Sequence, residues 1–191
     1  MKERGMIFNG EMVRAILDGR KTQTRRPIKW KQTRFTEIGE REDGRKWPWS
    51  EDAEHACDFW HPCPFGAVGD RIWVRETWAR YNIDQNSHDI AYRATTPADW
   101  PEEGRWRPSI HMPRWASRIL LEITDVRVER LMSISDGDAM HEGCSTADMK
   151  SGDCVADMFA RLWASIYGAE SWKANPWVWV IEFKRIEGGA A

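Results

Sequence analysis

The sequence lacks the features of a membrane-anchored or secreted protein. No apolar run approaches the roughly 20 residues that a membrane-spanning helix needs, and the first ten residues, MKERGMIFNG, lack the apolar stretch of a signal peptide. Cysteine is also scarce, with four positions, Cys57, Cys63, Cys144 and Cys154. We therefore expect free thiols in a protein of the reducing cytoplasm, without contact to a membrane.

The chain also lacks an excess of one charge. Its 28 basic and 30 acidic side chains leave a net charge of −2, so the protein as a whole is not a basic nucleic-acid binder. Any affinity for anions must come from a local patch. We find no internal repeat, and 191 residues are enough for a single domain with a proper core, here taken as 1–191.

One residue type is abundant, because the chain holds 13 tryptophans. Tryptophan buries a large apolar area and carries one N–H donor, and it also stacks on nucleobases. A core role and a base-stacking role both fit the composition.

The pattern along the chain predicts alternating helices and strands. Apolar spacing and caps predict a helix at 10–18 ended by Gly19, a helix from Ser135 to Gly143, and a third helix that opens at Ser151 or Asp153 and carries the apolar stripe of Met158, Phe159, Leu162, Trp163 and Ile166. Period-two alternation predicts strands at 22–26, 71–78, 89–94, 117–131 and 176–185. A parity change in the fourth strand predicts a bulge near Thr124–Asp125.

Residues 30–66 differ from the rest, since they are polar, irregular and rich in tryptophan. The triplet EDG at 42–44 indicates a hairpin turn, and we interpret the segment as an insertion or lid. Without it, the element order predicts an α+β fold built on a small, mostly antiparallel β-barrel with flanking helices.

The stretch GRKTQTRR at 19–26 places four cations, Arg20, Lys21, Arg25 and Arg26, within seven residues. Neighbouring positive charges lower the pKa of a lysine, and a neutral Lys21 could act as a base toward the Thr24 hydroxyl. The alternative is a solvated basic turn after a helix C-terminus, where the helix dipole favours cations.

Three further motifs could carry chemistry. The stretch HACDFWHPC holds His55, Cys57, His61 and Cys63, but its spacing differs from that of a usual zinc finger, so a loop with incidental thiols and imidazoles is the alternative to a metal site. In RWRPSIHMPRWASR (105–118), arginines interleave with tryptophans and a histidine, which suits phosphates and bases, or arginines packed over indoles. In WVRE (73–76), alternation puts Trp73 and Arg75 on one strand face.

Glu142 lies at the end of the helix DAMHEG, where a carboxylate opposes the helix dipole. Such a local penalty is understandable if the residue has a cationic partner or a functional role.

The combination of ILDGRKTQTRR, GDRIWVRETW, DAMHEG and the terminal WVWVIEFKR resembles the ASCH domains, relatives of the PUA fold, which is a small β-barrel associated with RNA. With RPSIHMPRWASR and the tryptophan-rich insertion, the chain is similar to the larger ASCH proteins of bacteriophages and prophages. The resemblance covers nearly the whole sequence, residues 30–66 least.

The resemblance implies a function. A small bacterial ASCH enzyme is an amidohydrolase that removes the acyl group from 4-acetylcytidine, and its motif puts the catalytic residues at Lys21, Thr24 and Glu142 and a substrate-binding arginine at Arg26. Other members are ribonucleases or RNA-binding modules. This chain departs from the small enzyme by having Arg25 in place of an aliphatic residue and by carrying two long inserted segments.

We therefore expect a hydrolase without a cofactor or metal that binds a modified nucleoside or RNA. Thr24 would attack the amide carbonyl, Lys21 would take its proton, and Glu142 would orient Lys21 or carry the proton to the leaving amine. For substrate binding we expect Trp73, Arg75, His111 and Arg114 beside Arg26. The alternatives are a non-catalytic RNA-binding module, a metal-independent ribonuclease, and a phage accessory protein that binds a host protein through residues 30–66.

Overall fold

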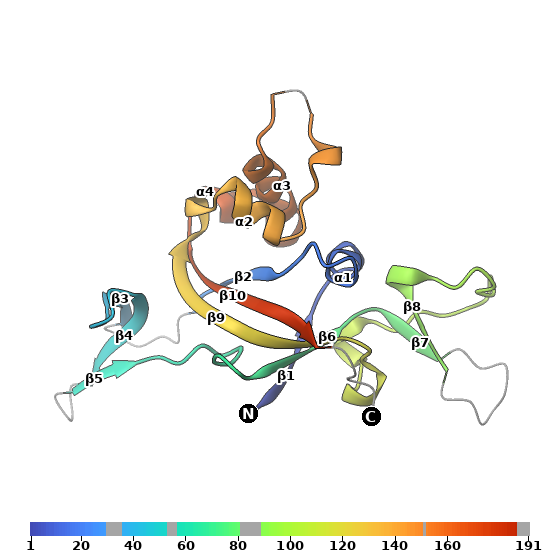
Figure 1. The fold of residues 1–191 in the computed structure, drawn as a ribbon, viewed down its shortest axis with the longest axis horizontal. Coiled ribbons are helices and arrows are strands. Elements are labelled where there is room, and N and C mark those ends of the chain that lie inside the picture. The colour runs from blue at the N-terminus through green and yellow to red at the C-terminus, as the bar shows by residue number, and fades with distance from the viewer. Residues whose placement is uncertain (30–35, 53–56, 81–88, 151, 187–191) are drawn as a thin grey trace.

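The fold combines helices with three β-sheets, which confirms the predicted α+β class (Figure 1). It is seen in a computed structural model that describes residues 1–29, 36–52, 57–80, 89–150 and 152–186. Within these residues, no helix has both the length and the apolar character to cross a membrane.

The central sheet has five strands. Their order across the sheet is β1 (Glu3–Ile7), β6 (Arg71–Arg75), β9 (Leu120–Arg130), β10 (Trp177–Ile186) and β2 (Gln23–Pro27). The β1–β6 pair is parallel and the other three pairs are antiparallel, so the pairing is mostly antiparallel as expected, but the described strands do not close into the expected β-barrel. Strand β1 was not predicted from the sequence, because residues 3–7 (ERGMI) show no clear alternation of polar and apolar side chains.

Strand β10 separates two hydrophobic clusters. Trp179, Ile181 and Phe183 pack into the larger cluster with α1 (Gly10–Leu17) and β6, whereas Val178 and Val180 pack into a second cluster under the later helices. All five side chains are buried, which explains why WVWVIEFKR is apolar at successive positions. The later helices therefore lie against one face of this strand, and the main core, which includes α1, lies against the other.

Four α-helices accompany the sheet. They are α1 (Gly10–Leu17), α2 (Asp136–His141), α3 (Val155–Tyr167) and α4 (Ala169–Lys173). Short 3₁₀ turns occur at η1 (Arg93–Thr95), η2 (Ser109–His111), η3 (Arg114–Ala116), η4 (Leu131–Ser133) and η5 (Thr146–Asp148). In Figure 1, α2, α3 and α4 lie together on one side of β9 and β10, and α1 lies beside β2.

The helix caps follow the predicted chemistry in two cases. Asn9 caps α1 by accepting from the N–H of Met12, and Gly19 follows with φ of 76°. Ser135 and Asp138 form the predicted capping box of α2. The predicted start of the third helix was wrong by one residue for Asp153: Cys154 is the N-cap of α3, and the Asp153 carboxylate instead accepts from the N–H of Lys150. Ser151 lies outside the described residues.

The predicted bulge in the long strand is confirmed. Glu182 of β10 is opposite Asp125, and the next residue, Phe183, is opposite Ile123, so Thr124 has no partner in the register. The extra residue changes which side chains of β9 face the core.

The strand predicted at 71–78 is in fact two strands. β6 ends at Arg75, and β7 (Trp78–Arg80) pairs with β8 (Ile90–Tyr92) in a separate two-stranded sheet. The break occurs because the Glu76 N–H points to the Met112 sulfur, at 3.4 Å, and the main chain of Trp78 pairs with that of Arg107. The strand predicted at 89–94 is likewise shorter, since η1 begins after β8.

The segment predicted as an insertion forms a sheet of its own, with β3 (Thr36–Glu40), β4 (Lys46–Asp52) and β5 (Cys57–Trp60) in antiparallel order. The hairpin at EDG is confirmed, with Gly44 at φ of 76° donating to the Arg41 carbonyl. Trp47 packs edge-on against Trp179 with ring centroids 5.0 Å apart. In Figure 1 this sheet lies at one end of the central sheet, and β7 and β8 lie at the opposite end.

The central sheet is open in its backbone pairing among the described strands, with β1 and β2 at its edges. A side chain links these two edges, because Nη2 of Arg26 on β2 donates to the carbonyl of Ile7 on β1 over 2.7 Å. The sheet therefore curls enough to bring its first and last strands within the reach of one arginine.

Candidate functional site

The turn between α1 and β2 is held against the end of α2. The Lys21 N–H donates to the Ala15 carbonyl at 2.9 Å, and the Thr22 N–H donates to the His141 carbonyl at 2.8 Å. These bonds place the GRKT segment beside Glu142, which is the C-cap residue of α2. Sequence segments more than a hundred residues apart thus meet at one point.

Gly143 allows this close approach. It has φ of 97°, and a Cβ atom at this position would lie 2.8 Å from Cβ of Ala15 and 3.2 Å from Cβ of Lys21. The Arg20 guanidinium then donates to the Gly143 carbonyl over 2.8 Å. The end of α2 therefore packs directly onto the lysine-bearing turn.

The Lys21 amine is buried, and its side chain is 0% exposed. Its Nζ atom donates three hydrogen bonds, to the Gln23 carbonyl at 2.7 Å, the Glu142 carbonyl at 2.9 Å and Oε2 of Glu142 at 2.7 Å. An ammonium has three N–H donors, so the geometry satisfies the charged form of this lysine completely. Lys21 is the cationic partner of the Glu142 carboxylate, which opposes the helix dipole at the C-terminus of α2.

Burial lowers the pKa of Lys21 below its ordinary value, because removal of the ammonium from water outweighs the attraction of Glu142. Arg26 lowers this pKa further by a smaller amount. We expected the neighbouring cations to be the main cause, and that was wrong, because the Arg20 guanidinium points away to Asp18 and Gly143.

Arg25 is also buried, and it is a second cationic partner of Glu142. Its Nη1 lies 3.4 Å from Oε1 of Glu142, and its Nη2 lies 3.1 Å from Oε2 of Glu129 and 3.6 Å from Oδ2 of Asp138. The ion pairs explain how an arginine can be buried at this position. Glu142 is consequently held from both sides.

A cavity of about 160 Å³ lies beside β2, at the edge of the central sheet. Its polar wall contains the hydroxyl-bearing Thr24, together with Asn9, Arg25, Arg26 and Glu142. Nε of Arg26 is buried and has no hydrogen-bond partner among the described residues. The structure thus brings Thr24, Arg26 and Glu142 to one cavity. Lys21 does not line this cavity, but its amine binds the Glu142 carboxylate that does.

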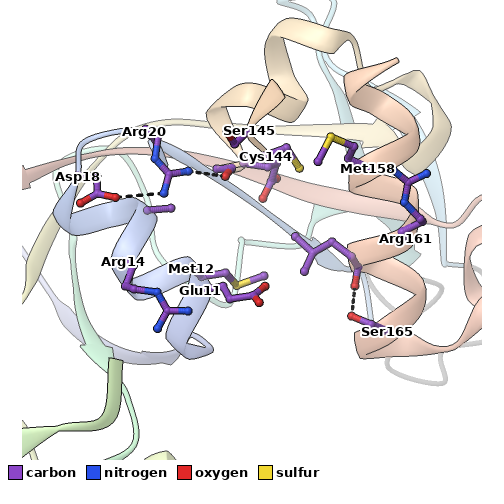
Figure 2. Close-up of a pocket in the computed structure, with 14 residues that line it drawn as sticks. Glu11, Met12, Arg14, Asp18, Arg20, Cys144, Ser145, Met158, Arg161 and Ser165 are labelled. Carbon is purple, nitrogen blue, oxygen red and sulfur yellow. Dashed lines mark hydrogen bonds and ion pairs between the residues drawn. The ribbon is translucent and has the colours of Figure 1, made fainter. Parts of the chain in front are cut away.

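A larger and more open cavity of about 720 Å³ lies between α1 and α3 (Figure 2). Arg14 and Arg20 border it on one side, and Cys144 and Arg161 border it on the other. Met12, Glu142 and Leu162 line both cavities, so the two spaces meet around the Glu142 side chain.

The other expected substrate-binding residues, Trp73, Arg75, His111 and Arg114, line neither cavity. The Arg75 guanidinium lies 5.4 Å from the Trp73 ring and donates to the Ile110 carbonyl. Arg114 donates to Glu3 over 2.9 Å. These four residues gather around β1, β6 and the 105–118 segment instead.

The motif considered for zinc is only partly covered by the described residues. His55 lies outside them, and the Cys57 side chain is not described. Cys63 is buried in the main core, where burial raises the pKa of its thiol to about 11, and His61 Nε2 lies 2.9 Å from the Ser50 hydroxyl. Within the described part of the chain, no group of three or more His, Cys, Asp or Glu side chains is arranged to hold a metal.

The apolar wall of the smaller cavity was not predicted as part of the site. It comes from α3, with Phe159, Leu162, Trp163, Ile166 and Tyr167. The sequence shows four of them, all but Tyr167, in an amphipathic stripe, which is typical of core packing. Ile166 and Tyr167 are exposed in the structure, and the apolar pattern by itself does not show which positions of a stripe remain uncovered.

No protein-family model, no curated protein and no solved structure matches this chain.

Proposed function

We propose that this chain is an ASCH-type protein of PUA-like fold that hydrolyses the amide of an acylated nucleobase, such as that of 4-acetylcytidine. The observation that carries the proposal is the buried Lys21–Glu142 pair beside Thr24. The pair has an Nζ–Oε2 distance of 2.7 Å, and Glu142 and Thr24 line the same cavity. These are the three residues for which the ASCH resemblance implies catalytic roles.

The curled sheet supports the same proposal. Arg26 joins the two edge strands through the Ile7 carbonyl and also lines the cavity. A curled, mostly antiparallel sheet with flanking helices is compatible with the small β-barrel that a PUA-like fold implies. Arg26 would then have two roles, one in the fold and one in binding.

The size of the cavity indicates which part of a substrate it would hold. About 160 Å³ is less than the roughly 300 Å³ at which pockets for drug-sized ligands begin. The space suits an acyl group or the edge of a base rather than a whole nucleoside. The larger cavity that shares Glu142 would leave room for the remainder of the molecule.

In the proposed reaction, the Thr24 oxygen attacks the amide carbonyl and its proton passes to a neutral Lys21 amine. The C–N bond breaks as the exocyclic nitrogen of the base takes that proton, which leaves an ester on Thr24. Water then hydrolyses the ester to release the carboxylic acid and restore Thr24. Nε of Arg26 is free to donate to the carbonyl oxygen, where negative charge develops.

The lowered pKa of Lys21 supports its role as a base, because a larger fraction of the amine is neutral near pH 7 than for an exposed lysine. The amine must also exchange one of its three hydrogen bonds for a contact with Thr24. The bond to the Gln23 carbonyl can be lost while both contacts with Glu142 remain.

The test is to incubate the purified protein with 4-acetylcytidine and other acylated nucleosides and to follow the products by chromatography. We expect free cytidine and acetate, and at least about 100-fold slower turnover in Lys21→Ala and Thr24→Ala. Thr22→Ala is the matched control, because Thr22 lies two residues away and lines neither cavity. Absence of turnover on every substrate, or turnover unaffected by Lys21→Ala, contradicts the proposal.

A non-catalytic nucleic-acid-binding module is the second candidate. The observation that favours it is the complete satisfaction of the Lys21 ammonium, which is what a structural lysine would show. It predicts salt-dependent RNA binding that persists in Thr24→Ala when no acylated nucleoside is turned over. Cleavage of unmodified RNA in the presence of a chelator would instead indicate a metal-independent ribonuclease.

A further inference from the structure

Trp115 presents its ring to solvent at the β7 end of the molecule. Its exposed fraction is 54%, whereas the neighbouring Trp78 is only 2% exposed. The two rings meet edge to face, with centroids 5.8 Å apart and an interplanar angle of 87°. Trp78 therefore supplies the apolar packing here, and Trp115 rests on it with much of its ring uncovered.

The exposed ring is held in place by its neighbours. The Arg80 guanidinium lies 5.6 Å from the Trp115 ring centroid. Beneath it, Trp78 exchanges two backbone hydrogen bonds with Arg107, of 3.2 and 2.7 Å, and the Arg107 guanidinium lies 5.2 Å from the Trp78 ring. We call Arg80, Arg107 and Trp115, with Trp78 beneath them, the Trp115 surface. An ordered ring loses little conformational freedom when a flat ligand stacks on it.

The two segments that form this surface are rich in arginine. Segments 71–80 and 105–118 together hold seven arginines, and Glu76 is their only acidic residue. The Glu76 carboxylate is buried and is bound on both oxygens by Arg118, at 2.9 and 3.0 Å. It does not offset the exposed cations.

Some of these arginines have carboxylate partners among the described residues. Arg71 and Arg114 share Glu3 as an ion-pair partner. Among the residues that the structure describes, no carboxylate lies within ion-pair distance of Arg80, Arg105 or Arg107. The Arg80 guanidinium beside the exposed Trp115 ring thus has no carboxylate partner among the described residues.

We propose that the Trp115 surface binds single-stranded nucleic acid, with one base stacked on Trp115 and the adjacent phosphates paired with Arg80 and Arg107. An indole face accepts any base by stacking, and guanidinium groups pair with phosphates. A double helix keeps its base faces covered, so it fits this surface less well than a single strand.

The Trp115 surface is separate from the candidate active site. None of its residues lines the two cavities around Glu142, and β7 lies at the end of the central sheet away from β3–β5 (Figure 1). The inference therefore does not rest on the proposed hydrolase function. If both are correct, the surface would hold the strand that carries the modified base.

The test is fluorescence anisotropy with dye-labelled single-stranded RNA and DNA 12-mers of mixed sequence, measured over a range of salt concentrations. We expect Trp115→Ala to weaken binding by about tenfold or more, and Trp115→Phe to retain most of the affinity. Salt dependence is measured as the slope of log Kd against log salt concentration. Arg80→Ala and Arg107→Ala should each reduce this slope by about 0.7. Controls are Lys173→Ala, an exposed cation on α4, and Met132→Ala, an exposed apolar side chain on η4.

Two competitors define the ligand. Duplex of the same sequence should compete poorly, and a polyglutamate peptide, which has charge without rings, should not displace the strand from the wild-type protein. The inference is overturned if neither 12-mer binds at low salt, or if Trp115→Ala folds normally by circular dichroism and binds as the wild type does. It is also overturned if the polyglutamate peptide displaces the strand. Trp115→Ala should leave turnover of a free acylated nucleoside unchanged, which separates this result from a failure of the proposed hydrolase function.

Discussion

Lys21 and Glu142 are 121 residues apart in the sequence, and they form a buried ion pair with an Nζ–Oε2 distance of 2.7 Å. The pair joins the turn after α1 to the C-terminus of α2. Arg25 adds a second cation on the other carboxylate oxygen, at 3.4 Å. The same contact thus connects the stability of the fold with the chemistry proposed for the cavity.

Removal of one member of this pair should destabilise the fold strongly. Glu142→Gln leaves the buried Lys21 ammonium without its carboxylate, and we expect the free energy of unfolding to fall by about 3–5 kcal/mol. Lys21→Met should cost less, because Arg25 still faces Glu142. Urea denaturation of both single variants and the double variant gives the coupling energy, and strictly additive effects would show that the two side chains do not interact.

The pH dependence of stability should report the lowered pKa of Lys21. Below its folded-state pKa the lysine is protonated in both states, and the burial penalty is fully present. Between that pKa and 10.5, the unfolded chain binds a proton that the native state does not, so stability rises with pH through this interval. Lys21→Met should lack this rise, and parallel stability curves for the two proteins up to pH 10.5 would contradict the lowered pKa.

Glu76 and Arg118 form a second buried pair with a different pH response. Burial raises the pKa of Glu76 above 4.5, against the opposing effect of Arg118. In Arg118→Met this pKa should rise further, and we expect a loss of about 2–3 kcal/mol at pH 7, because an uncompensated carboxylate is left buried while Arg118 itself is partly exposed.

The loss should shrink on acidification. The native state then binds a proton at higher pH than the unfolded chain, so stability is gained as pH falls through the folded-state pKa toward 4.5. Thermal unfolding of wild type and Arg118→Met at pH 7 and pH 5 measures the difference, and the double variant Glu76→Gln/Arg118→Met is the control, since it has no carboxylate to titrate. An equal deficit at both pH values would refute this account.

Two glycines with positive φ offer a matched comparison. Gly19 has φ of 76°, and a Cβ atom there would meet no described atom within 4 Å, so Gly19→Ala should cost only the strain of the left-handed conformation, about 1–2 kcal/mol. Gly143→Ala adds contacts of 2.8 Å with Ala15 and 3.2 Å with Lys21, which should increase the cost by about 1–3 kcal/mol. The two melting temperatures, measured side by side, check this order, and equal values would show that the end of α2 is not tightly packed on the turn.

Local elements were predictable where their signals lie within a few residues. The Asn9 cap and Gly19 define α1, the box of Ser135 and Asp138 starts α2, and a parity change predicts the bulge opposite Glu182 and Phe183. The break after β6 was missed, since it depends on contacts of Glu76 and Trp78 with residues 112 and 107. Alternation within a window contains no information about such partners.

The amino-acid sequence by itself determined the caps, the turns, the helical stripe of α3 and the clustering of cations in GRKTQTRR. Only the tertiary structure decided which carboxylate meets Lys21, where Arg25 finds its acidic partners, and that Trp73, Arg75, His111 and Arg114 lie away from the Glu142 cavities. The physical reason is that caps and periodicity act over one or two turns of chain. The pairing of buried charges is instead selected by desolvation, which acts on whichever segments the core brings together.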